Sequence, residues 1–470
     1  MKNDLRTVLN DFPSWGKSIF INKQPLSNRL QISQHYNSHI VSNPGSSRSG
    51  CEKTLLYTCK DTDAMVLIGL FGDRDINNNI LRKYCFHENK EKIAFDPVII
   101  SKSACHQKKH EGGLYKLPVL KLTSYDAGAY INSGVICSKW LDKPEFTSSI
   151  HRLKIINNNQ LALAFRVGGA LYKNFHDHLR KHKTLPISIN IGIPHVYYLL
   201  TSLSTSLHKN DRCKLRKIGE ILGYPVVLTK SLTQKGAYCF AESEYVIEGE
   251  ITNDYVNECK ENSESMAMPE FLGYMGKGKT QLPVINITGI YHKKNPIFQA
   301  FTGPGKEQSE LLAIPSEIEI KLYAPQTFNK YLTILDLHYP AYGGGKVSLV
   351  VKIKKKTDLL PLKEIHSYII SLNPLCKHIY LIDDDVDIYS SEDVLWALTT
   401  RFQPSRDMHV KKLPGWEMDP SQSRGYLSDI KALNESIIFD LTAPLFLKEK
   451  FRRFFNLSGV YNDKRTNRKG

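Results

Sequence analysis

Short apolar segments separated by turn residues dominate the middle of the chain, from about Lys116 to Tyr323. Segments of this length fit buried strands and are too short for domain-spanning helices. The clearest of them are Gly134–Cys137, Ile187–Ile191, Tyr245–Ile251 and Val284–Ile290. The pattern predicts a barrel or sandwich of strands, interrupted by one helix from Gly169 to Lys181.

The flanking parts of the chain alternate helical and extended patterns, which is typical of α/β domains. On the N-terminal side, the pattern predicts a helix at Leu5–Phe12, a strand at Ala64–Phe71 and a helix at Ile76–Tyr84. On the C-terminal side, it predicts strands at Val347–Ile353 and Ile379–Ile382, and helices at Leu362–Leu372 and Glu392–Thr400. We expect a mixed α/β (α+β) chain in three parts: an N-terminal α/β region (1–115), a central β-barrel domain (116–322) and a C-terminal α/β domain (323–470). The last part is expected to end in a basic helix near Pro444–Phe455.

Charge and composition narrow the class of protein. The chain carries 63 Lys and Arg against 47 Asp and Glu, a net charge of +16. These basic residues are spread along the chain without the interleaved aromatics of an RNA-binding module, so we expect solvated basic faces and no nucleic-acid partner. The longest apolar run, Ile187–Leu203, is interrupted by Asn190 and His195, which predicts no membrane span. With no secretory signal at the N-terminus, a cytoplasmic protein is expected.

The nine cysteines are odd in number and never spaced as CxxC, which favours free thiols over disulfides or a zinc site. Three other clusters have metal-ligand chemistry: Cys105 and His106 with His110, His178 with His182, and the aspartates Asp383–Asp385. We interpret the first as too small for a site, the second as part of a basic solvent-facing helix and the third as structural.

Several strings in the sequence resemble one protein family. From Ile379 to Asp407 the chain reads IYLIDDDVDIYSSEDVLWALTTRFQPSRD, an apolar strand that leads through an acidic turn into a helix. This string closely resembles a signature of the UbiD family of flavin-dependent decarboxylases. Other stretches resemble the family's motifs in the family's order: Gly69–Arg74, Tyr125–Tyr130, Ser149–Arg152, Gly168–Leu171, Tyr245–Glu250, Asn295–Ile297 and Tyr342–Lys346.

The resemblance implies a split-barrel flavin-binding domain, prenylated FMN as cofactor, and reversible decarboxylation of aromatic or α,β-unsaturated carboxylic acids. It also implies a flavin prenyltransferase as cofactor supplier, a homodimer or larger homo-oligomer, and manganese and potassium near the flavin phosphate. The chemistry agrees, because loss of CO2 from an sp2 carbon leaves an unstable carbanion and requires an electron sink. A guanidinium suits the substrate carboxylate, because it makes two charge-assisted hydrogen bonds to it. After CO2 has left, a carboxylic acid must protonate the carbon to which it was attached.

The resemblance also implies roles for particular residues. Arg152 matches the family's arginine beside flavin and substrate, and Glu270 matches the proton donor. Ile150, His151, Gly168 and Gly169 match cofactor-binding positions. The family's second acid falls on Ser265 in an ungapped alignment and on Glu264 with one inserted residue; we prefer Glu264, because a loop tolerates an insertion.

Two positions depart from the family's metal site. Thr147 stands where the family has a ligand asparagine, and Lys214 stands where it has a ligand glutamate. A hydroxyl is a weak ligand and an ammonium repels a divalent cation, which argues against the usual metal. Lys214 would then contact the flavin phosphate directly. The alternative interpretation is a non-catalytic family member, a subunit or scaffold that has lost the metal and flavin site.

Overall fold

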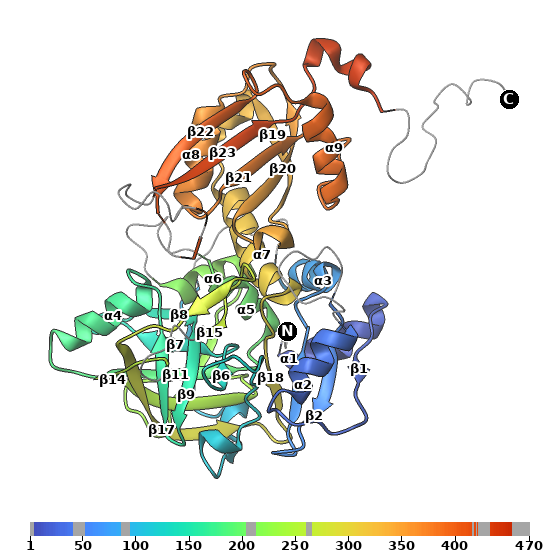
Figure 1. Cartoon of the computed structure of the whole chain (residues 1–470). Coiled ribbons are helices and arrows are strands. Elements are labelled where there is room, and N and C mark those ends of the chain that lie inside the picture. The colour runs from blue at the N-terminus through green and yellow to red at the C-terminus, as the bar shows by residue number, and fades with distance from the viewer. Residues whose placement is uncertain are drawn as a thin grey trace. The chain divides into compact units, whose positions relative to one another are not determined.

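The computed structural model describes residues 4–40, 52–85, 95–203, 213–259, 266–415, 418–419, 421 and 433–453. The chain divides into two compact units, Met1–Pro315 and Ser316–Gly470 (Figure 1). The expected N-terminal α/β region and the expected barrel both fall in the first unit, and the border between them stays a prediction.

A nine-stranded sheet forms the centre of the first unit, in the order β6-β9-β10-β17-β14-β11-β7-β8, with β5 also paired to β17. The strands are β5 (Lys108–Lys109), β6 (Tyr130–Ile131), β7 (Val135–Lys139), β8 (Phe146–Ile150), β9 (Arg152–Asn157), β10 (Gln160–Ala164), β11 (Leu185–Ile191), β14 (Tyr245–Val256) and β17 (Leu282–His292). Among the described residues no pairing joins β6 to β8, the two ends of this order. The four strands predicted from the sequence lie within β7, β11, β14 and β17, except that β7 begins at Val135, one residue after the predicted start, and are confirmed.

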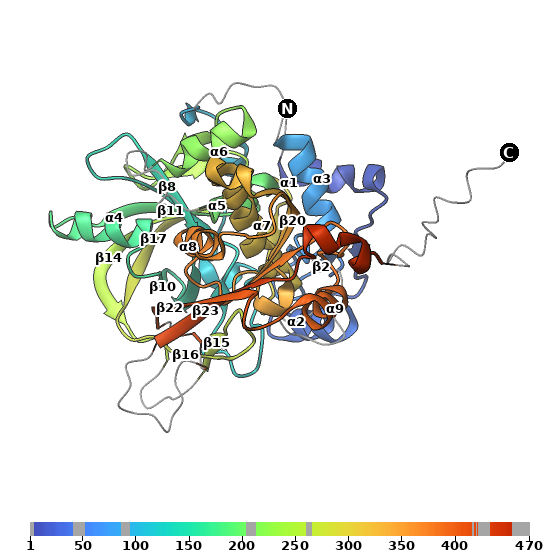
Figure 2. The same cartoon turned by 90° about the horizontal axis from the view of Figure 1, so that it is seen from above.

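Alternate residues of the central strands pack into one core. Ile187, Ile189 and Ile191 of β11 join Tyr245 and Ile247 of β14 in the main apolar cluster of the unit. Because successive side chains of a strand point to opposite faces, Val246 and Glu248 lie on the face away from this core. Helix α4 (Ala170–Leu179) packs against β8 and β11 (Figure 2), which confirms the predicted helix.

A second, four-stranded sheet in the first unit has the order β1-β2-β3-β18. Its strands are β1 (Phe20–Ile21), β2 (Leu55–Thr58), β3 (Met65–Ile68) and β18 (Ile297–Gln299). The remaining strands are β4 (Val98–Ile100), β12 (Val227–Lys230), β13 (Tyr238–Phe240), β15 (Met266–Pro269) and β16 (Met275–Lys277). The helices are α1 (Leu5–Asp11), α2 (Gln31–His35), α3 (Arg74–Tyr84), α5 (His195–Thr201), α6 (Lys214–Leu222) and α7 (Lys306–Tyr323), which crosses the unit boundary. Asp73 caps α3 by accepting from the Asp75 N–H, which is why this helix begins directly after its turn.

The second unit is a five-stranded sheet in the order β19-β20-β21-β23-β22. Its three central strands are parallel and both edge strands are antiparallel. The elements are β19 (Leu332–His338), β20 (Ser348–Lys355), α8 (Leu362–Leu372), β21 (His378–Ile382), α9 (Ser391–Arg401), β22 (Met408–Pro414) and β23 (Leu433–Asp440). The four elements predicted here are confirmed.

The predicted terminal helix is a 3-10 helix at Leu445–Phe451, with i to i+3 bonds such as Leu447 N–H to the Pro444 carbonyl at 3.1 Å. The end of the predicted range, residues 454–455, lies outside the described residues. None of the described helices combines the length and the apolar character needed to cross a membrane. The eight described cysteines are free thiols, as predicted.

Candidate active site

One arginine lies between two carboxylates in the first unit. Arg152 Nη2 donates to Glu258 Oε2 at 2.7 Å, and Arg152 Nη1 donates to Glu270 Oε1 at 3.1 Å. The Glu258 side chain is fully buried, and those of Arg152 and Glu270 are 14% and 20% exposed. A guanidinium held by two buried or half-buried carboxylates forms strong charge-assisted bonds and keeps one orientation. The structure therefore brings together the predicted Arg152 and Glu270.

Three separate strands deliver these side chains. Arg152 is the first residue of β9, Glu258 follows β14 by two residues, and Glu270 follows β15 directly. Glu258 is held further by the Tyr130 hydroxyl at 3.2 Å from Oε1 and by the Lys279 backbone N–H at 2.9 Å from Oε2. These two donors orient the carboxylate from the sides that Arg152 does not occupy.

The charges of the site support one another. Burial alone would lower the pKa of Arg152, but the negative charges of Glu258 and Glu270 outweigh it and raise the pKa above its usual value. The guanidinium is thus a permanent cation. Its Nε atom is buried and has no hydrogen-bond partner among the described residues, so one N–H donor of the guanidinium is available to a ligand.

A tight hairpin positions Glu270. Its N–H donates to the Tyr274 carbonyl at 2.9 Å, and its carbonyl accepts from Gly273 N–H at 2.8 Å. Gly273 has a φ of +87°, which glycine adopts without strain. Across the hairpin, a Cβ added to Gly276 would lie 2.8 Å from Glu270 Oε1 and 2.4 Å from the Met268 carbonyl. Gly276 therefore leaves the space that the Glu270 carboxylate occupies.

Two of the residues expected to bind the cofactor directly precede Arg152 in the chain. Ile150 ends β8, and His151 connects it to Arg152 at the start of β9; its Nε2 lies 2.8 Å from the Ser149 hydroxyl. Burial, followed by the positive charge of Lys214, lowers the pKa of His151 to about 4. His151 is therefore neutral at pH 7, and Lys214 supplies positive charge to this part of the site.

These residues do not fit the family's divalent metal. The Lys214 ammonium is buried and donates to the Thr201 carbonyl at 2.8 Å. The hydroxyl of Thr147 is buried and has no hydrogen-bond partner in the part of the chain that the structure describes. A hydroxyl and an ammonium at these two positions offer neither the charge nor the oxygen ligands that a hard divalent cation requires. A cation and an open hydroxyl donor are both groups that suit an anion.

The predicted glycine turn leads into α4. Ala164 at the end of β10 pairs with Arg152, and four residues later Gly168 has a φ of +78° with open space where a Cβ would stand. Gly169 caps α4, but its own N–H already donates to the Arg166 carbonyl at 3.1 Å. The first-turn N–H groups of α4, which lack intrahelical partners, are the donors that this end can offer an anion.

Glu258 was not among the residues predicted from the sequence. Counting back from Glu270 pointed to Glu264 or Ser265, and both lie outside the described residues, so the role of Glu264 stays a prediction. Among the described residues, the buried acid on Arg152 is Glu258, twelve positions before Glu270. A longer insertion before Glu270 would have placed it, but no pattern in this polar stretch indicates the insertion's length.

The other candidate clusters have different outcomes. Arg401 donates to Asp383 at 2.9 Å and to Asp385 at 2.6 Å, which makes the triple aspartate a structural ion-pair group, as interpreted. The view of His178 as solvent-facing is wrong: it is buried and bonds the Asn174 carbonyl at 2.9 Å. His182 lies beyond the end of α4 with a φ of +53°, so the two histidines do not share a helical face.

Comparisons with known proteins agree with this geometry. The UbiD family model, described as the 3-octaprenyl-4-hydroxybenzoate carboxy-lyase Rift-related domain, matches residues 98–307. The model of the C-terminal domain of the same carboxy-lyase matches residues 310–439.

Individual relatives are decarboxylases. The gallate decarboxylase of Lactiplantibacillus plantarum is 29% identical over 341 residues, which cover 70% of this chain and 69% of the relative. The apo structure of a 3,4-dihydroxybenzoic acid decarboxylase from Enterobacter cloacae superimposes with a TM-score of 0.84, at 24% identity over 96% of each chain. The structure of the UbiD-class enzyme HmfF of Pelotomaculum thermopropionicum in complex with FMN superimposes with a TM-score of 0.79 at 22% identity. The superposition covers 99% of this chain and 100% of the HmfF chain.

Proposed function

The chain belongs to the UbiD family of carboxy-lyases, and on that premise we propose that Arg152, Glu258 and Glu270 form its catalytic group. It is a decarboxylase of this family, acting on an aromatic or α,β-unsaturated carboxylic acid. One observation carries the assignment of the group. Arg152 is held between Glu258 at 2.7 Å and Glu270 at 3.1 Å, while its buried Nε keeps a donor free for a ligand.

We infer that the cofactor is prenylated FMN, held by Ile150, His151, Arg152, Gly168, Gly169 and Lys214. Support comes from the flavin in the related HmfF structure, from the positive charge of Lys214 near His151 and from the buried hydroxyl of Thr147, which has no partner among the described residues. The bound flavin supplies an electron sink for the charge left on carbon when CO2 departs. We do not assign manganese to the site, because Lys214 replaces a ligand; this chain's own ammonium balances the phosphate instead.

Each residue of the group has a separate task. Arg152 binds the negatively charged substrate or cofactor through charge-assisted hydrogen bonds, which also fix its orientation. Glu258, fully buried and bonded to Tyr130, keeps the guanidinium in place. Glu270 lies at a partly exposed hairpin and, in its acid form, delivers a proton to the carbon from which CO2 has left. Solvent contact at Glu270 allows it to be reprotonated between turnovers.

The alternative of a non-catalytic subunit is not favoured, since the relatives are decarboxylases. It predicts that the site binds no flavin. We further propose that a flavin prenyltransferase supplies the cofactor, that the substrate is a small molecule and that the protein assembles as a homodimer or larger homo-oligomer.

The test is a measurement on protein co-expressed with a flavin prenyltransferase. We expect a flavin absorbance spectrum and CO2 release from at least one member of a panel of hydroxybenzoic and unsaturated acids. Glu270→Gln should retain the flavin and lose at least a hundredfold in kcat, within the range for general acids. Glu111→Gln, an exposed carboxylate paired only with Lys109, is the matched control. A colourless protein with no extractable flavin would overturn the proposal.

A further inference from the structure

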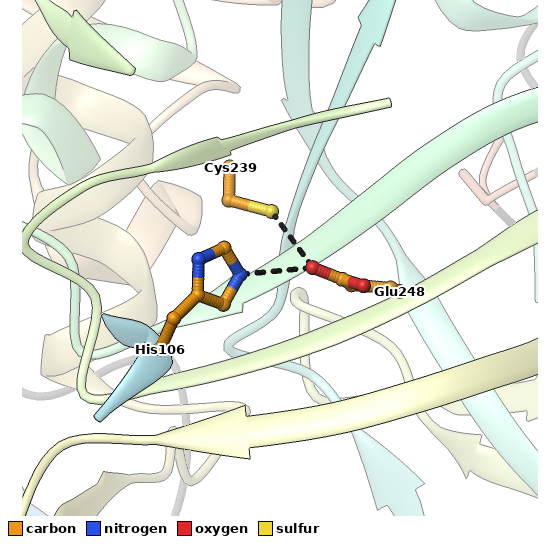
Figure 3. A group of neighbouring side chains, drawn as sticks. All are labelled: His106, Cys239 and Glu248. Carbon is orange, nitrogen blue, oxygen red and sulfur yellow. Dashed lines mark hydrogen bonds and ion pairs between the residues drawn. The ribbon is translucent and has the colours of Figure 1, made fainter. Parts of the chain in front are cut away.

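A second cluster of reactive side chains lies in the same unit, on the face of β14 away from the main core. His106, Cys239 and Glu248 each offer one atom, and these atoms lie within 4.8 Å of one another (Figure 3). Cys239 and Glu248 come from the consecutive strands β13 and β14, and His106 comes from a 3-10 turn at Ala104–His106, more than a hundred positions earlier. The side chains of Cys239 and Glu248 are fully buried, and that of His106 is 8% exposed.

From this geometry we propose that His106 Nε2, Cys239 Sγ and Glu248 Oε1 form a binding site for a zinc-like divalent cation. The site shares no residue with the group formed by Arg152, Glu258 and Glu270. Imidazole, thiolate and carboxylate are the three ligand types that zinc takes in proteins, usually in a tetrahedral arrangement. Hard cations such as magnesium and calcium avoid sulfur, so the thiol selects against them.

The distances fit a small tetrahedral ion. Glu248 Oε1 lies 2.9 Å from His106 Nε2 and 3.6 Å from Cys239 Sγ. Usual zinc bond lengths at tetrahedral angles place an oxygen about 3.4 Å from a nitrogen ligand and about 3.6 Å from a sulfur ligand. The sulfur therefore already lies at the expected distance from the carboxylate oxygen, and the imidazole nitrogen must withdraw from that oxygen by about 0.5 Å to admit the ion.

The surrounding groups hold the ligands as the partners of metal ligands do. Glu248 Oε2 accepts from the Thr233 N–H at 2.8 Å and from its hydroxyl at 2.7 Å, and Oε1 accepts from the Leu232 N–H at 3.0 Å. These bonds fix the carboxylate with Oε1 on the side of His106. The other ring nitrogen of His106, Nδ1, lies 3.3 Å from the Ser103 hydroxyl. Such second contacts set the tautomer and the orientation of metal ligands.

Charge balance also permits the ion. As ligands, a carboxylate, a thiolate and a neutral imidazole carry two negative charges together, which one divalent cation neutralises. The protons that the ligand atoms held pass to solvent when the ion binds. The occupied site therefore holds no net charge in a buried region.

The experiment uses the full-length protein after treatment with a strong chelator. Co2+ serves as the spectroscopic probe, because a cobalt–thiolate bond gives a charge-transfer absorption that nitrogen and oxygen ligands do not give. We expect one equivalent of Co2+ to produce this absorption and one equivalent of Zn2+ to abolish it by competition. Loss of orienting partners already costs metal sites 10–100-fold in affinity, so Cys239→Ser should abolish the absorption and weaken Zn2+ binding at least a hundredfold.

Cys259→Ser is the matched control, because Cys259 is a partly exposed thiol beside Glu258 and its loss should leave the absorption intact. His106→Gln tests a second ligand in case Cys239→Ser does not fold, and it should also abolish tight binding. Flavin retention in Cys239→Ser should equal that of the parent protein, which separates this site from the Arg152 group. The proposal is overturned if Co2+ gives no charge-transfer absorption, or if the absorption disappears in Cys259→Ser and persists in Cys239→Ser.

Discussion

Arg152 donates to Glu258 at 2.7 Å across 106 positions of sequence, and the carboxylate that receives this bond is fully buried. A buried charge needs a buried partner, because an uncompensated one costs several kcal/mol. The pair is therefore one unit, in which neither residue keeps its place without the other.

The first prediction concerns Glu258. Replacing it by Gln keeps the shape and part of the hydrogen bonding but removes the charge that orients Arg152. We expect kcat to fall at least tenfold with the flavin retained. The kcat of Glu258→Asp should lie between that of Glu258→Gln and that of the parent. Steady-state kinetics with flavin quantified in each sample is the measurement. Unchanged kcat in Glu258→Gln would remove Glu258 from the catalytic group.

The second prediction tests the space beside Glu270. Gly276→Ala places a methyl group 2.8 Å from Glu270 Oε1 and 2.4 Å from the Met268 carbonyl, so the hairpin must shift. We expect a loss of about 1–3 kcal/mol in unfolding free energy and a tenfold or greater loss of kcat. Gly16→Ala is the control: its φ of +66° disfavours alanine, but open space surrounds the added methyl group, so activity should be unaffected. Parental kcat in Gly276→Ala would show that Glu270 does not depend on this glycine.

The third prediction concerns Lys214. Flavin should survive strong chelators, because an ammonium replaces the family's metal ligand. Lys214→Glu reverses the charge and should abolish flavin retention in metal-free buffer, with partial recovery on addition of Mn2+, while Lys214→Gln should weaken retention less. Lys217→Glu, a charge reversal on the same helix, is the control. Retention by Lys214→Glu equal to that of the parent would make Lys214 an ordinary structural lysine.

The fourth prediction is a pH dependence of stability. Glu307 is fully buried, one of its oxygens lacks a partner among the described residues, and burial together with the charge of Glu52 raises its pKa to about 8. In the unfolded chain this carboxyl ionises near its ordinary pKa of 4.5. Its contribution to the unfolding free energy is therefore full below pH 4.5 and is lost as the pH rises through about 8.

Glu307→Gln imitates the protonated form and removes this dependence. Urea unfolding at pH 6, 7.5 and 9 should show that the unfolding free energy of the parent falls with pH relative to that of the variant. A shift of this size implies a total difference of a few kcal/mol, on the order of 1.4 kcal/mol for each pKa unit. Parallel curves for the two proteins would mean that Glu307 is ionised in the folded state.

The fifth prediction concerns the second unit. Arg401, 1% exposed, neutralises Asp383 and Asp385, so Arg401→Met should destabilise the protein by about 3–5 kcal/mol without releasing the flavin. Arg406→Met removes an arginine that is 64% exposed and bonded to Asp407, and should cost less than about 1 kcal/mol. Equal losses in chemical unfolding would contradict a structural role for the buried pair.

The sequence by itself determined several of the strands and helices in each unit. Periodicity placed β11, β14, β20, β21 and α8, because burial of one face imposes a local pattern on each element. Motif resemblance also located Arg152 and Glu270, which stand in short strings at the start of β9 and after β15.

Only the tertiary structure decided which distant residues meet. Glu258 reaches Arg152, and Glu248 reaches His106, because the fold brings together segments more than a hundred positions apart. A local pattern records which face of a strand is buried, but it holds no information about the partner that lies on that face. Pairing and register fix that partner, and they depend on the packing of the whole unit.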